Sequence, residues 1–418
     1  MKEKANNPRD IINQINSAQR EFDNMLSLSA NENIMSLTAR SYLAGNFSNR
    51  YFFHSTNNKS ISDFPEFVAA SSKNLEDIIS QTKSTIKNMF DAKYVNLAPL
   101  SGIHAMIMVM LSLTDSGDNI ASLDPSQNGH YITGKLIERT GRNTFYLPTN
   151  KGEVDTSNIK KFVETNSIKM IYLDGMSYTR RFDIKSIRKA VGNDVIIVLD
   201  ASHILGLIAG NQFQKPFAEG ADIICGNTHK TFPGPHRGII IARSIRYSKY
   251  IKIHESKLYS SNQLNSLMSF AITVFEMFKY GESYAKKTIS NAKYLSQFLK
   301  EKDVGFDIAK TDNHQVHIIY TTRNQAYELF NNLLYQGINT HVCFTKSEGY
   351  FVRLGTQELT RYGMGKKEME TIAEIISKVE KGKDMRKQTL HLKSRFRKVQ
   401  YSFDNIVYDR LQERKICQ

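Results

Sequence analysis

Short apolar segments alternate with longer amphipathic segments over roughly residues 85–245. The longer ones, such as 102–113 and 183–192, have the hydrophobic spacing of helices. The short ones are apolar throughout and rich in β-branched residues, which is typical of parallel strands buried on both faces. Such strands are expected at residues 93–100, 119–124, 144–148, 169–175, 195–201, 222–227 and 237–243. The pattern predicts an α/β fold with a mostly parallel sheet and helices on both of its faces.

The pattern changes after residue 245. A long helical segment, 264–302, leads into strands at 314–320 and 349–355 and helices at 324–337 and 366–382. This mixture predicts a smaller α+β domain in the carboxyl-terminal part of the chain. The domains expected are a helical arm at 1–50, a large α/β domain at 51–285 and a small domain at 286–418.

The composition is that of an ordinary globular protein. Of the 418 residues, 40% are hydrophobic and 23% are charged, and this length favours two domains over one. The sequence has neither an apolar run long enough for a membrane span nor an apolar signal-peptide region at its amino terminus. Its three cysteines, Cys225, Cys343 and Cys417, are too widely spaced for a disulfide framework or a zinc ribbon. We therefore expect a cytoplasmic protein with no metal site and no membrane association.

The formal net charge of +15 raises the question of nucleic-acid binding. Much of this charge lies in residues 381–398, where Asp384 is the only acidic residue. Such a run is usually a solvated helix face, and no aromatic interleaving, zinc finger or RNP-like pattern accompanies it. Nucleic-acid binding is therefore kept only as an alternative.

Three predicted strands lead into residues with recognisable chemistry, and ligands of such sheets bind at the carboxyl ends of strands. Ser101 and Gly102 begin a helix, whose amino end favours an anion. Asp200 ends a buried strand, where a carboxylate requires a cationic partner such as a protonated pyridine nitrogen. Lys230 follows another buried strand, and a lysine that loses hydration can form an imine with an aldehyde.

Each of these residues has an ordinary structural alternative: a common turn, a capping aspartate or a lysine that extends into solvent. Together they match the three requirements of pyridoxal 5′-phosphate, which has a phosphate, a ring nitrogen and an aldehyde. His130, beyond another strand end, is a candidate to stack on the cofactor ring. The spacing thus predicts a pyridoxal-phosphate enzyme.

The sequence also resembles the serine hydroxymethyltransferase family of fold-type I pyridoxal-phosphate enzymes. The segments that carry the resemblance are in the same order as in the family and span about residues 26–370. They are SANENIMS (29–36), NGHYITG (128–134), DASHILGL (200–207), THKTFPGP (228–235), TDNHQVHI (311–318) and VRLGTQELTRYGM (352–364).

The resemblance implies a role for each matching residue. Lys230 would form the internal aldimine, Asp200 would pair with the pyridinium nitrogen, and His203 and His130 would lie on the two faces of the ring. The phosphate would be held by Ser101, Gly102 and Ile103, with Thr228 and His229 beside the lysine. Arg353 would bind the substrate α-carboxylate, with Asn31 also on the substrate. The active site of this family lies at a dimer interface, so Tyr51 and Ser261 would come from the neighbouring chain.

Two departures from the family make folate use doubtful. Folate-dependent members have a K-Y-x-E-G-Y-P-G-x-R-Y-Y-G-G segment, and residues 49–67 here keep Tyr51 but have Phe53 in the place of the glutamate. Phenylalanine cannot transfer a proton. Met176 lies near the position where the family has a serine beside the cofactor's phenolic oxygen.

Other segments resemble the L-threonine transaldolases of natural-product pathways, a branch of the same family. These segments are LSLSANEN (26–33), CGNTHKTFPGPHRG (225–238), NHQVHI (313–318) and YSFDN (401–405). This resemblance implies cleavage of L-threonine to acetaldehyde and a glycyl quinonoid, which adds to an acceptor aldehyde to give a β-hydroxy-α-amino acid. His130 or a held water would be the base at the β-hydroxyl. The alternatives are a threonine or β-hydroxy-amino-acid aldolase, a folate-dependent hydroxymethyltransferase, and a non-catalytic pyridoxal-phosphate-binding or nucleic-acid-binding protein.

Overall fold

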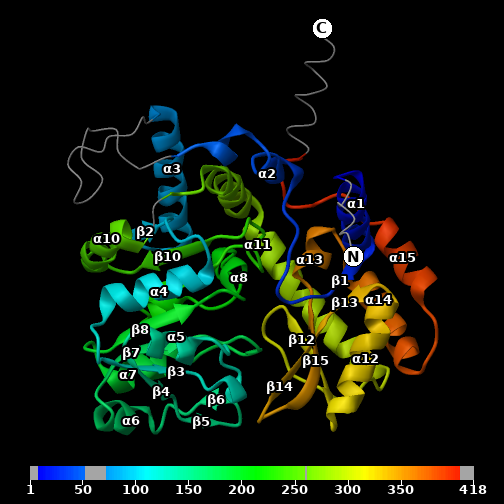
Figure 1. Ribbon diagram of the computed structural model, residues 1–418. Coiled ribbons are helices and arrows are strands. Elements are labelled where there is room, and N and C mark those ends of the chain that lie inside the picture. Colours follow the sequence, from blue (N-terminus) through cyan, green and yellow to red (C-terminus); the bar gives the residue numbers. More distant parts are fainter. Residues whose placement is uncertain (1–7, 52–71, 259–260, 405–418) are drawn as a thin grey trace, which may run out of the picture.

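The computed structural model describes residues 8–51, 72–258 and 261–404, and its two larger sheets each have their own helices (Figure 1). The larger sheet has seven strands in the order β2-β10-β9-β8-β7-β3-β4. Its strands are β2 (Tyr94–Asn96), β3 (Asn119–Ser122), β4 (Asn143–Tyr146), β7 (Ile168–Leu173), β8 (Ile196–Asp200), β9 (Ile223–Asn227) and β10 (Gly238–Ala242). Strand β10 is antiparallel to both β2 and β9, and the other pairings of this sheet are parallel. The seven strands fall within the seven predicted segments to within a residue, and the mostly parallel α/β fold is confirmed.

Side chains of the large sheet alternate between two packed layers, as they do in any strand. In β8, Ile197 and Leu199 pack on one layer and Val198 on the other. The helices that cover the sheet and its edges are α3 (Lys73–Phe90), α4 (Gly102–Leu113), α5 (Thr133–Arg139), α6 (Ile159–Thr165), α7 (Ile184–Val191), α8 (Leu205–Ala209), α9 (Pro216–Glu219) and α10 (Arg246–Leu258). Of these, α4 and α10 lie on the layer that contains Val198.

The smaller sheet is antiparallel, with the order β11-β12-β15-β14. Its strands are β11 (Asp307–Ile308), β12 (Gln315–Tyr320), β14 (His341–Thr345) and β15 (Gly349–Gly355), and its helices are α12 (Arg323–Tyr335), α13 (Gln357–Arg361), α14 (Lys366–Glu380) and α15 (Arg386–Ser394). The sequence pattern did not predict β14, which lacks the continuous burial of its neighbours. The long helix α11 (Leu264–Glu301) packs against the cores of both sheets. The predicted boundary near residue 285 falls inside this helix and stays a prediction.

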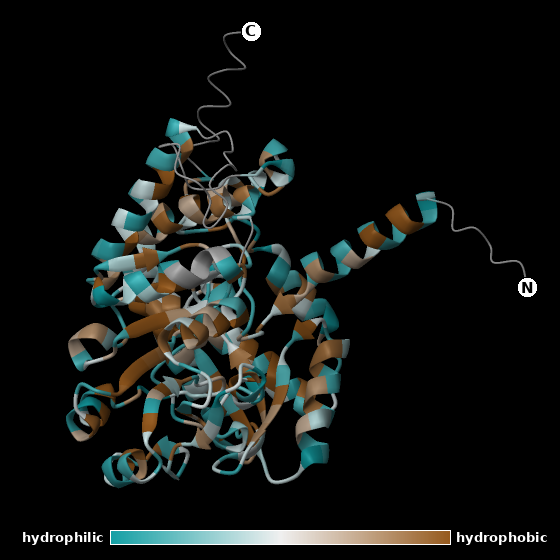
Figure 2. Ribbon diagram, turned by 60° about the vertical axis from the view of Figure 1, so that its left-hand side comes forward, coloured by the Kyte–Doolittle hydropathy of each residue, from teal (hydrophilic) through white to brown (hydrophobic). Residues whose placement is uncertain are grey.

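The amino-terminal segment connects both parts. Helix α1 (Pro8–Asn24) projects from the body of the molecule and exposes apolar side chains, including Ile15 and Phe22 (Figure 2). The chain then passes through β1 (Leu26–Ser27), which pairs with β13 (Ile338–Asn339), and α2 (Leu37–Ser41). The remaining elements are the 3-10 helices Asn46–Asn49 and Pro125–Gln127 and the strands β5 (Thr149–Asn150) and β6 (Glu153–Val154).

The residues of the YSFDN segment that the structure describes fasten the carboxyl-terminal part of the chain to this region. Asp404 accepts hydrogen bonds from the Leu37 and Thr38 amides at the start of α2, at 3.0 and 2.8 Å. The Phe403 amide donates to Glu276 on α11 at 3.0 Å. Asn405 lies outside the described residues. Within the described ranges, every helix is too short or too polar to cross a membrane.

Candidate active site

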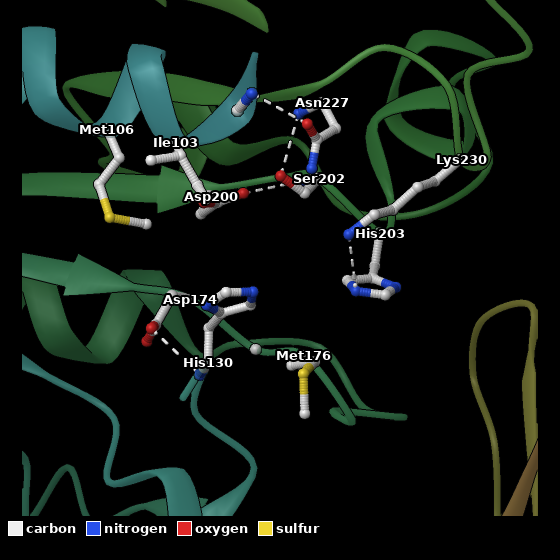
Figure 3. Close-up of a pocket in the computed structure, with 12 residues that line it drawn as sticks. Ile103, Met106, His130, Asp174, Met176, Asp200, Ser202, His203, Asn227 and Lys230 are labelled. Carbon is white, nitrogen blue, oxygen red and sulfur yellow. Dashed lines mark hydrogen bonds between the residues drawn. The ribbon is translucent and has the colours of Figure 1, made fainter. Parts of the chain in front are cut away.

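A pocket lies at the carboxyl ends of β7, β8 and β9, beside the amino end of α4 (Figure 3). This is where a mostly parallel sheet is expected to bind its ligand. The pocket is lined by Gly102, Ile103, Met106, His130, Asp174, Gly175, Met176, Asp200, Ser202, His203, Asn227 and Lys230. The structure thus brings together six of the residues that the sequence singled out: Gly102, Ile103, His130, Asp200, His203 and Lys230.

Lys230 lies three residues beyond β9, with its Nζ 3.0 Å from Nε2 of His203. Burial lowers the pKa of Lys230 to about 8, although the nearby charge of Asp200 opposes this shift. Burial also holds the pKa of His203 well below its usual value, so this imidazole is neutral and accepts the hydrogen bond. A buried lysine that is partly neutral near pH 8 is suited to bond covalently to an aldehyde.

Hydrogen bonds within residues 228–235 hold the turn that contains Lys230. The Gly234 amide donates to the Thr228 carbonyl at 2.8 Å, and the Thr228 hydroxyl donates to the Pro235 carbonyl at 2.7 Å. The Thr228 hydroxyl is therefore used inside the turn, away from the pocket. His229 stacks on His236 with ring centroids 3.6 Å apart and is not among the lining residues.

Asp200, at the end of β8, is held on both carboxylate oxygens. Oδ1 accepts from the Ser202 amide at 2.9 Å, and Oδ2 accepts from the Tyr172 hydroxyl at 3.1 Å. Each oxygen keeps a second acceptor position. Asp200 lines the pocket and is only partly buried, so it can accept from a cationic ring N–H.

His130 lies across the pocket, and a second carboxyl group positions it. Asp174, which follows β7, accepts hydrogen bonds from the backbone amides of His130 and Leu123, at 3.2 and 3.3 Å. Burial, with a smaller contribution from the charge of Asp200, raises the pKa of Asp174 to about 8. Burial lowers the pKa of His130, so its imidazole is neutral and able to accept a proton. Tyr131 stacks on His130 with ring centroids 4.7 Å apart.

The amino end of α4 closes another side of the pocket. Ser101 is the N-cap residue, and its Oγ accepts from the His104 amide at 3.1 Å. The Gly102 amide donates to Oδ1 of Asn227 at 2.9 Å. A Cβ on Gly102 would lie 2.6 Å from the same oxygen, so glycine is required for this close approach. The amino end of α4 favours an anion, although in this structure the Gly102 and His104 amides already donate to Asn227 and Ser101.

Arg353 comes from the smaller sheet and is almost fully buried. Its Nη1 donates to the Met176 carbonyl at 2.9 Å, and its Nη2 donates to Oδ1 of Asn31 at 2.9 Å. Its Nε has no hydrogen-bond partner among the described residues. Nη1 also donates to the hydroxyl of Ser177 at 3.4 Å. Ser177 is buried and directly follows Met176 in the chain. The Asn31 amide group is in turn 3.4 Å from Nε2 of His341.

The segment 29–36 touches both halves of the site. Asn31 contacts Arg353, and Nδ2 of Asn33 donates to the backbone carbonyl of Lys230 at 2.6 Å and to the Tyr284 hydroxyl at 2.8 Å. The sequence had placed Asn31 on the substrate but had given Asn33 no role.

Two residues expected from a neighbouring chain are not among the residues that line the pocket of this one. Tyr51 is 68% exposed, and Ser261 is partly buried, its hydroxyl accepting from the Gln263 amide. Phe53 and the rest of residues 52–67 lie outside the described residues.

Comparison with known proteins identifies the family. The family model described as serine hydroxymethyltransferase matches residues 4–376. The chain belongs to the serine hydroxymethyltransferase family. It is therefore a pyridoxal-phosphate-dependent enzyme.

Relatives within the serine hydroxymethyltransferase family include enzymes of two kinds. A serine hydroxymethyltransferase of Archaeoglobus fulgidus is 31% identical over 95% of this chain and 93% of that protein. An L-threonine:uridine-5′-aldehyde transaldolase of a Streptomyces species is 30% identical over 88% of this chain and 87% of that protein. The crystal structure of L-threonine transaldolase from Pseudomonas fluorescens in its internal aldimine state is 27% identical, with a TM-score of 0.86 over 95% of this chain and 94% of that one.

The residues present fit the cofactor of this family. The amino end of α4 favours the phosphate, Asp200 keeps free acceptor positions for the ring nitrogen, and Lys230 is buried with a lowered pKa. Nδ1 of His203 is buried with no partner among the described residues, as is Nε of Arg353. Such atoms are costly unless a ligand or water binds them.

The sequence missed several residues of this site. Asp174 could have been found, because it ends a buried strand as Asp200 does. Asn227 lies at the end of β9 and gave no separate signal. Tyr172 and Cys225 are ordinary core residues in the sequence, and only the pairing of three strands brings them beside Asp200.

Proposed function

We propose that the chain is an L-threonine transaldolase, which transfers the glycine part of L-threonine to an acceptor aldehyde. The observation that carries this proposal is the set of groups lining the pocket. Its two carboxyl groups, Asp174 and Asp200, are both held by donors in the protein. Besides Lys230, which would bond to the cofactor, the remaining titratable side chains among the described lining residues are the imidazoles of His130 and His203. Phe53 stands in the sequence where folate-dependent members have a glutamate. The transaldolases among the relatives and solved structures agree with this proposal.

In the proposed reaction, Arg353 binds the α-carboxylate of threonine. Its guanidinium is buried and oriented by Asn31 and the Met176 carbonyl, and its Nε lacks a partner among the described residues. A planar fork of this kind fits a carboxylate in bidentate geometry. Its fixed position would orient the Cα–Cβ bond for cleavage.

Pyridoxal 5′-phosphate, when bound, accepts the electron pair of the bond that breaks at Cα. Lys230 would hold the aldehyde carbon of the cofactor, with neutral His203 accepting from Nζ. Asp200 would accept a hydrogen bond from the ring nitrogen and keep it protonated. Ser101, Gly102 and Ile103 would bind the phosphate at the start of α4.

His130 would remove the proton of the β-hydroxyl. Burial makes its imidazole neutral, and the Asp174 carboxyl group fixes its backbone at the pocket wall. A neutral imidazole that lines the pocket is able to accept a proton, as a general base must.

A folate-dependent serine hydroxymethyltransferase is the second candidate, because relatives with that activity are as similar as the transaldolases. A threonine or β-hydroxy-amino-acid aldolase would use the same residues, and differs only in releasing glycine before a second aldehyde reacts. A non-catalytic or nucleic-acid-binding protein has no need of Lys230, Asp200 and Arg353 together.

The experiment is to incubate the loaded enzyme with L-threonine and a panel of aldehydes and to identify the products by mass spectrometry. A transaldolase gives a β-hydroxy-α-amino acid that contains the added aldehyde. Formation of only glycine and acetaldehyde would support the aldolase. Acceleration of serine cleavage by tetrahydrofolate, without aldehyde incorporation, would support the hydroxymethyltransferase.

We further propose a homodimer in which Tyr51 and Ser261 complete the partner's site. Both lie outside the pocket of their own chain, and α1 exposes an apolar stripe that includes Ile11 and Ile15. Sedimentation of the loaded protein tests this, since a monomer with full activity would contradict it. The cytoplasmic location and the role in natural-product biosynthesis stay predictions from the sequence.

A further inference from the structure

Three neighbouring strands place a buried hydrogen-bond chain behind Asp200. In the parallel pairing of β8 with β9, Asp200 lies opposite Cys225, and in that of β7 with β8, Tyr172 lies opposite Val198. Paired residues point to the same side of a sheet, as do residues two apart in one strand. Tyr172, Asp200 and Cys225 therefore share the face that α4 covers.

The contacts form one continuous line. The Tyr172 hydroxyl donates to Oδ2 of Asp200 at 3.1 Å and lies 3.1 Å from Sγ of Cys225. Tyr172 and Cys225 are both completely buried, so water does not replace either contact. Burial raises the pKa of the Tyr172 hydroxyl and that of the Cys225 thiol, and both groups keep their protons.

The available protons determine which group donates in each of these two hydrogen bonds. Tyr172 has one hydroxyl proton, and an ionised carboxylate can only accept. The Tyr172 proton therefore goes to Asp200, and the Cys225 S–H points at the Tyr172 oxygen. In this arrangement each buried polar atom of the line has a partner, and the thiol polarises the hydroxyl that holds the carboxylate.

At this place a tyrosine costs more than an aliphatic residue if only packing matters, because its hydroxyl is buried. The same layer of the core is filled by Val198, Ile223 and Ile240, and a buried hydroxyl costs free energy unless it is hydrogen bonded. The Tyr172 hydroxyl contacts the carboxylate of Asp200, which faces the pocket, and the Cys225 thiol contacts that hydroxyl. Their arrangement therefore acts on Asp200.

We propose that Tyr172, supported by Cys225, is a positioning residue that holds the Asp200 carboxylate in the orientation that keeps the cofactor ring nitrogen protonated. The hydrogen bond from the Tyr172 hydroxyl fixes one carboxylate oxygen, as the Ser202 amide fixes the other. Without the Tyr172 donor, the carboxylate is free to turn away from the ring nitrogen, which then holds its proton less strongly. The proposal rests on the cofactor and on the role proposed above for Asp200, and it does not depend on which aldehyde is the acceptor.

The test is nitrogen NMR of the full-length protein loaded with pyridoxal phosphate that carries ¹⁵N in the ring, because this signal reports ring protonation directly. In Tyr172→Phe, which removes one oxygen and leaves the packing ring, we expect the signal to move toward the unprotonated value and turnover to fall about tenfold. Tyr94→Phe is the matched control, since Tyr94 is a buried tyrosine of the same layer on β2, and it should leave the signal unchanged.

Two further variants keep the test decisive if Tyr172→Phe does not fold. Cys225→Ala should move the signal in the same direction by less, whereas Cys225→Ser keeps a donor and should stay close to the wild type. Equal signals for the two Cys225 variants, a wild-type signal in Tyr172→Phe, or an equal shift in Tyr94→Phe would each overturn the proposal.

Asp200→Asn separates this proposal from the role of Asp200 itself. If the ring nitrogen stays protonated in Asp200→Asn, the placement of Asp200 at the ring fails, and the inference on Tyr172 fails with it. A wild-type enzyme that incorporates no aldehyde would contradict the transaldolase and leave these NMR results unaffected.

Discussion

The two sheets contribute to the active site in different ways. The large sheet supplies Asp200 and Lys230 from the ends of neighbouring parallel strands, separated by only thirty positions along the chain. The small sheet supplies Arg353 from within β15, where His317 of β12 and His341 of β14 lie opposite it in the two pairings. One contribution follows from strand topology, and the other depends on how the small sheet is placed against the large one.

This difference shows in the contacts of each half. The large-sheet residues are held by their own neighbours, such as the Ser202 amide and His203. Arg353 is held mainly by groups outside its sheet, namely Asn31 and the carbonyl of Met176. Small movements between the two sheets should thus leave the positions of Asp200 and Lys230 unchanged. The same movements should displace Arg353 from its partners.

The largest expected effect is at the covalent end of the large-sheet half. Lys230→Ala should abolish covalent attachment of the cofactor and lower turnover by on the order of a thousandfold or more, because no other group at this place replaces the amine. Absorbance of the loaded protein and the rate of threonine cleavage measure the two effects. Lys185→Ala, on the exposed surface of α7, is the control and should keep both properties. Undiminished turnover in Lys230→Ala would mean that Lys230 has only a structural role.

A smaller effect is expected in the half built by the small sheet. Arg353→Lys keeps the charge but loses the fork, so the KM for L-threonine should rise about thirtyfold, the equivalent of about 2 kcal/mol from a hydrogen bond to a charged group. Turnover at saturation should change less, and steady-state kinetics separates the two. Arg139→Lys, an exposed residue of α5, is the matched control. A fall in kcat with an unchanged KM would place Arg353 away from the substrate carboxylate.

The smallest expected effect concerns the pH dependence of the large-sheet half. Burial depresses the pKa of Lys230 from 10.5 to about 8, and only the neutral amine attacks an aldehyde. The rate at which cofactor-free protein takes up pyridoxal phosphate should therefore rise roughly fivefold from pH 7 to pH 8 and then level off. Stopped-flow absorbance measures this rate. A continued rise toward the ordinary lysine value would mean that Lys230 is solvated.

The free energy of unfolding of the cofactor-free protein should also depend on pH through Lys230. Because the folded-state pKa of Lys230 lies below its unfolded value, the unfolded chain binds more protons between these two values. The contribution of this group to stability therefore increases as the pH rises from about 8 toward 10.5.

The sequence predicted most of the large sheet because burial on both faces leaves a clear signal in the residues themselves. The strand containing Asp200 and the strand before Lys230 were both recognised from apolar runs that end in a charged or polar residue. The β14 strand was missed because its side chains are mostly half-buried and carry no strong pattern. Met176 was recognised as a departure, but the buried hydroxyl of Ser177 beside it was not.

The part of the site that could not be predicted depends on contacts between distant segments. No periodicity in the sequence relates Tyr172 to Asp200 or Cys225, because strand order and register decide which residues become neighbours. Thr228 illustrates the opposite case. The family resemblance implied a cofactor contact for Thr228, but the following proline-rich turn uses its hydroxyl locally.

One short stretch of chain spans the two halves compared above. Asn31 and Asn33, two positions apart, bind the guanidinium of Arg353 and the main chain at Lys230. This segment contributes no reacting atom. It nevertheless sets the spacing between Arg353, which would bind the amino acid, and Lys230, which would bond to the cofactor. Any displacement of Asn31 and Asn33 therefore alters the surroundings of Arg353 and of Lys230 at the same time.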